Sequence, residues 1–217
     1  FDPDTLSKRV NLTAGEDLIA TSASNYYDGV TQNEAETFYA ALKTPGDTMP
    51  VSYGLNSRLV KREGKIYEEV NRLGGHYGAA IEKIIYWLEK ASAVAENEKQ
   101  RQVIDLLIEY YRTGDLKTFD EYSIQWVTDL DSHIDFVNGF IEVYGDPIGL
   151  KGSWESIVNF KDLDASHRTE IISANAQWFE NNSPTDTAFK KEEVKGVSAK
   201  VITAAILAGD CYPSTPI

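Results

Sequence analysis

The most informative segment of this chain is Ile134-Asp-Phe-Val-Asn-Gly-Phe-Ile-Glu-Val-Tyr-Gly-Asp-Pro147, whose alternating residues predict an extended strand. Successive side chains of a strand point to opposite faces, so we expect Glu142 and Tyr144 to lie together on the face that carries Phe136 and Phe140. A carboxylate and a phenol at the end of an apolar face are typical of the mouth of a binding cleft. The spacing alone also fits a solvated glutamate and a half-buried tyrosine whose ring packs against the protein while its hydroxyl contacts water.

Helices and extended segments alternate on both sides of this strand. We expect a short helix near 14–21, a hairpin of 55–61 with 65–70, and helices at 79–93, 96–111 and from 164 to about 181. Two capping boxes, Thr31 with Glu34 and Thr118 with Glu121, predict the starts of two more helices. Residues 196–207 fit a helix or a buried strand, and we favour a strand; 213–217 should be extended. These elements predict an α+β fold, mostly helical with a small mixed β core.

Composition bounds the class of protein. The chain has 217 residues, 42% hydrophobic and 11% aromatic, enough for one large or two small globular domains. The net charge of −13 comes from 34 acidic against 21 scattered basic residues, so nucleic acid and anionic membranes are not expected partners. No run of eighteen apolar residues predicts a membrane span.

Cys211 is the single cysteine, which rules out an intrachain disulfide. A single cysteine fits a reducing compartment or an indifference to redox state, and we expect a cytoplasmic protein. The chain begins at Phe1 without an initiator methionine and stops abruptly at Ile217, so we expect it to be a fragment of a longer polypeptide.

Metal ligands are few. His76, His133 and His167 are the only histidines and no two are within a few helical turns, so a complete catalytic zinc site is not expected within the chain. A calcium loop is rejected because, in a loop that starts with Asp129 as position 1, Ile134 and Phe140 occupy positions 6 and 12, where glycine and glutamate are needed. Phosphate-binding loops and nucleophile elbows are not found.

The residues at the end of this strand and directly after it match a known family signature. Gly139-Phe-Ile-Glu-Val-Tyr-Gly-Asp-Pro147, followed by Gly152-Ser-Trp-Glu155, resembles the signature of the dipeptidyl peptidase III family of zinc exopeptidases, in the form of its bacterial, Bacteroides-like members. The similarity runs along most of the chain, through Ile19-Ala-Thr-Ser-Ala-Ser-Asn-Tyr26, Ser52-Tyr-Gly-Leu-Asn56, Val194-Lys-Gly-Val-Ser-Ala-Lys-Val-Ile202 and Gly209-Asp-Cys-Tyr-Pro-Ser-Thr-Pro216.

The resemblance implies part of a two-lobed zinc peptidase. Residues 1–162 would be the helical and β-hairpin portion of the substrate-binding lobe, 163–190 a helical excursion towards the zinc lobe, and 191–217 a returning strand with the start of the substrate-binding edge. The zinc motif would follow on C-terminal sequence, so the fragment alone would bind no zinc and be inactive. The expected partners are oligopeptide substrates and the remainder of the same polypeptide.

The resemblance also implies roles for single residues. Glu142 would bind the protonated α-amino group of the peptide, Glu155 would assist as a second carboxylate, and Tyr144 would stabilise the carbonyl of the scissile bond during catalysis. Pro216 and Ile217 would begin the edge along which the substrate lies. Trp154 leaves open that Glu155 belongs to a packed helix start.

Two positions depart from the family pattern. Gly145 stands where many members have arginine, and Ser153 stands where others have an acid, so the selectivity of the cleft should differ from the eukaryotic enzymes.

The expected function is therefore the substrate-binding portion of a zinc-dependent dipeptidyl peptidase that removes dipeptides from the amino terminus of oligopeptides. The alternatives are a stand-alone peptide-binding module and a scaffold or interaction domain without catalysis.

Overall fold

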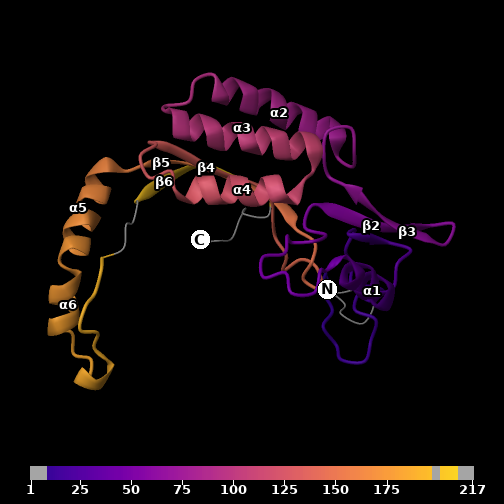
Figure 1. The fold of residues 1–217 in the computed structure, drawn as a ribbon, viewed down its shortest axis with the longest axis horizontal. Helices are drawn as coiled ribbons and strands as arrows, with labels where there is room; N and C mark the ends of the chain where they lie inside the picture. The colour runs from indigo at the N-terminus through magenta and orange to yellow at the C-terminus, as the bar shows by residue number, and fades with distance from the viewer. Residues whose placement is uncertain (1–8, 197–200, 210–217) are drawn as a thin grey trace, which may run out of the picture. The chain divides into compact units, whose positions relative to one another are not determined.

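The computed structural model describes residues 9–196 and 201–209 and confirms the α+β class (Figure 1). The chain divides into two compact units. The first contains the chain up to Ser132 together with Asn138–Glu155, and the second contains His133–Val137 and the chain from Ser156 onward.

A three-stranded sheet and one helix form the first part of unit 1. Strand β2 (Ser57–Arg62) pairs with β1 (Tyr27–Asp28) in parallel and with β3 (Lys65–Val70) in antiparallel orientation, in the order β1-β2-β3. The predicted hairpin is confirmed: Arg62 faces Lys65, and the two residues between them both have positive φ, 52° and 78°, as a type I′ turn requires.

Helix α1 (Gln32–Leu42) begins at the predicted capping box, in which Thr31 and Glu34 satisfy each other's backbone amides. Its buried Ala35 and Tyr39 pack in a cluster with Ile19, Val30 and Leu59. The predicted helix near 14–21 is wrong, because the segment forms turns. The Asp17 carboxylate accepts hydrogen bonds from the amides of Ala20 (2.9 Å) and Gln32 (3.0 Å), which holds the segment against the start of α1.

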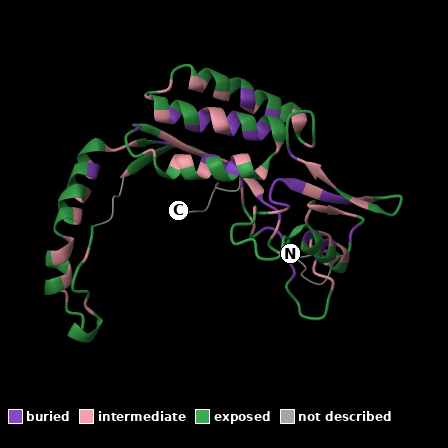
Figure 2. Ribbon diagram, in the orientation of Figure 1, coloured by how far each residue is buried: buried purple, intermediate pink, exposed green. Residues whose placement is uncertain are grey.

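Three helices form the rest of unit 1: α2 (Gly78–Ser92), α3 (Glu98–Thr113) and α4 (Leu116–Val127). Helix α3 packs against both others and carries the purple buried stripe of Figure 2, which includes Val103, Leu107 and Tyr111. The predicted helix at 96–111 is confirmed; it begins at the Asn97 cap and ends at Gly114 in the left-handed region.

The predicted capping box at Thr118 is wrong, because α4 already begins at Leu116. Asp115 is its N-cap and accepts a hydrogen bond from the amide of Lys117 at 3.1 Å. The carboxylate directly after Gly114 therefore outcompetes the threonine three residues later.

Strands β4 (Ile134–Glu142), β5 (Ser153–Lys161) and β6 (Ile202–Gly209) form a second sheet in the order β4-β5-β6. The predicted strand from Ile134 is confirmed up to Glu142, but its continuation through Tyr144 is wrong. A turn begins there, in which the amide of Asp146 donates to the carbonyl of Val143 at 3.0 Å. Strand β6 confirms the extended prediction for the described part of 196–207, whereas 213–217 lies outside the described residues.

Unit 2 also contains α5 (Leu163–Ala174), α6 (Ala176–Asn182) and the short 3₁₀ helix η1 (Thr187–Phe189). The single helix predicted over this segment is two helices, because Asn175 leaves the helical conformation. Its side chain donates to the carbonyl of Ile171 at 2.7 Å and its amide to that of Ile172 at 3.0 Å, which closes α5. Within the described parts of the chain, no helix has the length and apolarity to cross a membrane.

Candidate functional site

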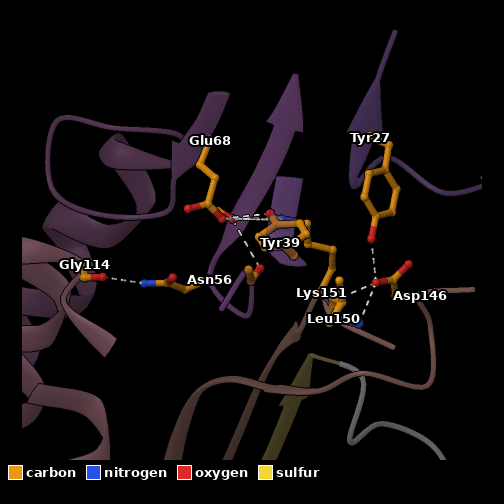
Figure 3. Close-up of polar contacts among 10 residues, drawn as sticks. Tyr27, Tyr39, Asn56, Glu68, Gly114, Asp146, Leu150 and Lys151 are labelled. Carbon is orange, nitrogen blue, oxygen red and sulfur yellow. Dashed lines mark hydrogen bonds and ion pairs between the residues drawn. The ribbon is translucent and has the colours of Figure 1, made fainter. Parts of the chain in front are cut away.

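The loop between β4 and β5 is folded around the buried carboxylate of Asp146. One carboxylate oxygen accepts hydrogen bonds from the Tyr27 hydroxyl (2.8 Å) and from the amides of Leu150 (2.8 Å) and Lys151 (2.9 Å), and the other accepts from the amide of Ile148 (3.3 Å) (Figure 3). Asp146 is only 4% exposed. The aspartate of the Gly-Asp-Pro sequence therefore shapes the loop and does not face a substrate.

Lys151 ends this loop and is completely buried, beside Glu68 and the hydroxyls of Tyr39 and Ser57 (Figure 3). Its Nζ donates to Ser57 Oγ at 2.9 Å and to the Tyr39 hydroxyl, and lies 3.7 Å from Glu68 Oε1. Glu68 in turn accepts hydrogen bonds from Tyr39 (2.8 Å) and Ser57 (2.5 Å). Each member of this network is hydrogen-bonded. The network therefore fixes the loop to α1 and to both strands of the hairpin.

Burial lowers the pKa of the Lys151 ammonium to about 8, although the charges of Glu68 and Asp146 act in the opposite direction. Burial likewise raises the pKa of the Tyr27 and Tyr39 hydroxyls above their ordinary value of 10.0, helped at Tyr27 by Asp146 and at Tyr39 by Glu68. Both phenols therefore act as neutral donors to carboxylates.

These pKa shifts predict how stability depends on pH. Free lysine titrates near 10.5, so between pH 8 and 10.5 the unfolded chain keeps a proton that folded Lys151 has lost, and this group makes the folded state more stable as pH rises. Above about pH 10, the raised pKa values of Tyr27 and Tyr39 act in the opposite direction. Urea unfolding of the wild type and of Lys151→Met from pH 7 to 9.5 should show the difference shifting in favour of the wild type above pH 8. Parallel curves would contradict this prediction.

The loop presents two of the predicted site residues outward. Glu142 is exposed at the last position of β4, and Tyr144 is 56% exposed in the turn that follows. Both side chains are exposed, but Glu142 ends β4 and Tyr144 follows in a turn, so the two do not share one face of a strand as predicted.

Glu155 differs from the other two, because it is buried at 4% exposure. It lies in β5, so the alternative of a helix start is wrong. Ser153 connects it with Glu142: the Ser153 hydroxyl is 3.2 Å from the Glu142 carbonyl and 3.5 Å from Glu155 Oε1. The structure therefore brings Glu142 and Glu155 to neighbouring strand ends, while Pro216 and Ile217 lie outside the described residues.

Strand β5 is fixed to α3 beside this site. The Trp154 indole donates to the Tyr111 hydroxyl at 3.0 Å, and Tyr111 itself donates to the Asn138 side chain of β4. Burial raises the pKa of the Tyr111 hydroxyl above its ordinary value, so it stays protonated and can serve as both donor and acceptor. Both strands are thereby held against α3, β4 at its middle and β5 near its start.

Gly145 has a neighbour that the sequence did not predict. A Cβ atom at this position would lie 3.2 Å from Arg9 Nη2 and 3.2 Å from the Tyr26 hydroxyl. Arg9, Tyr26 and Gly145 also line a small polar pocket. The Arg9 guanidinium therefore lies directly beside Gly145. Arg9 is far from Gly145 in the sequence, so the motif around Gly145 could not predict this positive charge.

A larger, mainly apolar pocket of about 450 Å³ opens in unit 1. It combines residues from five separate segments: Asn25, Tyr26, Ser57, Arg58, Asn71, His76, Tyr77, Ala80, Ile81, Ile84, Phe140, Gly152, Ser153 and Trp154. We call it the aromatic pocket. Only the apolar stripe of α2 could be predicted, because the other walls of the pocket come together from segments that are far apart in the sequence.

The described residues do not fit a zinc ion. Nowhere among them do three or more His, Cys, Asp or Glu side chains gather in a way that could hold a metal. His76 lines the aromatic pocket, and His133 and His167 are exposed. His167 Nδ1 lies 3.5 Å from Glu170 Oε2, one helical turn away. The described residues therefore supply no set of metal ligands.

Comparison with known proteins agrees with the resemblance in the sequence. Dipeptidyl peptidase 3 of Rattus norvegicus is 29% identical over 140 residues, which are 64% of this chain and 19% of that protein. Dipeptidyl peptidase 3 of Dictyostelium discoideum is 27% identical over 124 residues, which are 57% of this chain and 18% of that protein. The chain spans about a fifth of the length of these curated relatives.

A solved structure of DPP III from Caldithrix abyssi has the same fold, with a TM-score of 0.67 at 22% identity, and the match covers 86% of this chain and 35% of that one. The structure of dipeptidyl-peptidase III from Corallococcus sp. strain EGB matches with a TM-score of 0.58 at 21% identity. The model of peptidase family M49 matches residues 21–205, which include the whole loop from Glu142 to Glu155. This chain is therefore a member of peptidase family M49.

Proposed function

We propose that the chain is the substrate-binding portion of a zinc-dependent dipeptidyl peptidase, which removes dipeptides from the amino terminus of oligopeptides. Membership of family M49 and the similarity to dipeptidyl peptidase 3 proteins support this activity. The catalytic zinc is proposed to bind to sequence outside these 217 residues, and that sequence would be the main partner of this chain. A cytoplasmic location stays a prediction.

The proposal depends mainly on one observation: Glu142 and Tyr144 are exposed at the start of a loop whose conformation is fixed by the buried side chains of Asp146 and Lys151. A peptide's ammonium would bind to the Glu142 carboxylate in a charge-assisted contact, worth about 1.5–3 kcal/mol. The Tyr144 hydroxyl would donate to a peptide carbonyl oxygen and stabilise the negative charge that develops there. An anchor at the ammonium fixes how many residues precede the cleaved bond.

Glu155 would act differently from the sequence expectation. Because Glu155 is buried, a peptide can contact it less readily than it can contact Glu142. Glu155 Oε1 nevertheless lies 3.5 Å from the Ser153 hydroxyl, which donates a hydrogen bond to the Glu142 carbonyl. We therefore propose that Glu155 contributes negative potential to the ammonium site and orients Ser153.

The proposal predicts that binding depends on a free amino terminus. In calorimetry with the full chain, Ala-Ala-Ala-Ala should bind about 10-fold or more tightly than its N-acetylated form, because acetylation removes the charge that Glu142 recognises. The same pair should bind equally to Glu142→Gln. Equal binding of both peptides to the wild type would refute the assignment of Glu142.

Kinetics separate the enzyme from the alternatives. A stand-alone peptide-binding module would discriminate the two peptides but release no dipeptide in any longer form of the polypeptide. A scaffold would do neither.

A further inference from the structure

The hydroxyl of Tyr111 joins both strands of the site to α3 through a single oxygen atom. It accepts a hydrogen bond from the Trp154 indole at 3.0 Å and donates one to the side-chain oxygen of Asn138. Tyr111 is completely buried, and this burial raises the pKa of its hydroxyl, so the hydroxyl keeps its proton. An indole has one N–H group, and that of Trp154 is used on Tyr111.

Trp154 lies between two residues of the candidate site on β5. Side chains alternate along a strand, so an indole held against α3 leaves Ser153 and Glu155 on the opposite face. The Ser153 hydroxyl donates to the Glu142 carbonyl at 3.2 Å and lies 3.5 Å from Glu155 Oε1. The orientation of Trp154 therefore sets where this hydroxyl and this carboxylate stand relative to Glu142.

Other contacts already hold β4 and the residue before β5. A Cβ atom at Gly139 would lie 3.0 Å from the Phe119 ring, so β4 packs closely on α4 without help from the Tyr111 hydroxyl. The Gly152 amide donates to the Leu55 carbonyl at 2.8 Å, directly before β5 begins. The indole contact is a second anchor on the other side of Ser153. Two anchors on either side of one residue define the direction of its side chain.

The neighbouring tyrosine of α3 provides an internal comparison. Tyr110 is also completely buried, but within the described parts of the chain its hydroxyl has no hydrogen-bond partner. Its ring packs against those of Tyr111 and Phe119, with centroid distances of 5.2 and 4.6 Å. The rings of both tyrosines therefore fill the core, whereas the Tyr111 hydroxyl also connects the helix to the site.

We propose that the Tyr111 hydroxyl is a positioning group for the amino terminus of a bound peptide, acting through the Trp154 indole on the ammonium site at Glu142. The link to a peptide rests on the function proposed above, whereas the bridge between the strands rests on the structure alone. Because Tyr111 is completely buried, it touches no substrate and acts only through the strands that it holds.

Tyr111→Phe and Tyr110→Phe form a matched pair, because each removes one buried hydroxyl from α3 and only the first breaks the bridge. The first measurement needs no peptide. Hydrogen exchange of the Trp154 indole N–H, assigned by its loss from the spectrum of Trp154→Phe, should become at least 10-fold faster in Tyr111→Phe. In Tyr110→Phe it should stay within twofold of the wild type. Unchanged exchange in Tyr111→Phe would overturn the bridge.

The second measurement is calorimetry of the full chain with Ala-Ala-Ala-Ala and its N-acetylated form. The preference for the free peptide, about 10-fold or more in the wild type, should fall to threefold or less in Tyr111→Phe and stay within twofold of the wild-type value in Tyr110→Phe. A purely structural role would lower the folded fraction, which reduces the number of binding sites and leaves this preference unchanged. An unchanged preference after loss of the bridge overturns the inference and leaves the proposed function intact.

Trp154→Phe tests the route through β5, because it keeps a ring and removes the N–H donor. The preference for the free peptide should fall as it does in Tyr111→Phe, and the double variant should differ from Trp154→Phe by less than twofold, since both changes break one hydrogen bond. A further loss in the double variant would overturn the route through Trp154. Equal binding of both peptides to the wild type would refute the proposed function, and the positioning role with it.

Discussion

Glu142→Gln should lower kcat/KM for dipeptide release about 10- to 150-fold in the intact enzyme. The change keeps the size of the side chain but removes the charge that binds the peptide's ammonium, a loss of about 1.5–3 kcal/mol. Glu142 is exposed at the end of β4, so the free energy of unfolding should stay within about 0.5 kcal/mol of the wild type.

The control for this experiment is Glu82→Gln, which removes a negative charge from an exposed position of α2. It separates a local contact from a change in overall charge, and it should leave kcat/KM within twofold. N-acetylated peptides supply a second control, because they already lack the ammonium and should lose nothing further in Glu142→Gln. An equal loss for free and acetylated peptides would show that Glu142 does not bind the amino terminus.

Asp146→Asn should have the largest effect on stability, lowering the free energy of unfolding by about 2–4 kcal/mol. The buried carboxylate accepts four hydrogen bonds, three of them at one oxygen. An amide of the same shape turns one oxygen into a donor and removes the negative charge near the buried ammonium of Lys151.

The measurement is urea unfolding together with hydrogen exchange of the Leu150 and Lys151 amides, which should exchange faster in the variant. Asp131→Asn, at an exposed position before β4, is the control and should change stability by less than about 0.5 kcal/mol. A variant as stable as the wild type, with both amides still protected, would contradict the role given to Asp146.

Local sequence signals predicted much of the fold. The capping box of Thr31 and Glu34, the glycine of the hairpin turn and the apolar stripes of α2 and α3 each depend on residues only a few positions apart. Because these features depend mainly on local sequence, they could be predicted without knowledge of the tertiary structure.

Strand β5 was not predicted, because polar residues are buried on both of its faces. Glu155, Ser156 and Asn159 are all buried, so the segment shows no alternation of apolar and polar residues. The burial of Lys151 could not be predicted either, because lysine is usually found at the surface. Its contacts with Tyr39, Ser57 and Glu68 offset the cost of burying the ammonium.

For the site, the motif predicted the exposure of Glu142 and Tyr144 but not the turn that presents Tyr144. It also could not place Arg9 beside Gly145, or assemble the aromatic pocket, because these depend on contacts between segments far apart in sequence. The roles of Glu142, Tyr144 and Glu155 themselves stay predictions.

The division of the β4–β5 loop into outward and inward side chains has a consequence for how such proteins diversify. Because the conformation depends on Asp146 and Lys151, substitutions at positions 142 and 144 can be sampled without refolding the segment. Libraries randomised at these two outward positions, with the inward pair retained, should therefore yield mostly folded variants, and natural or laboratory selection can retune peptide preference there by single steps.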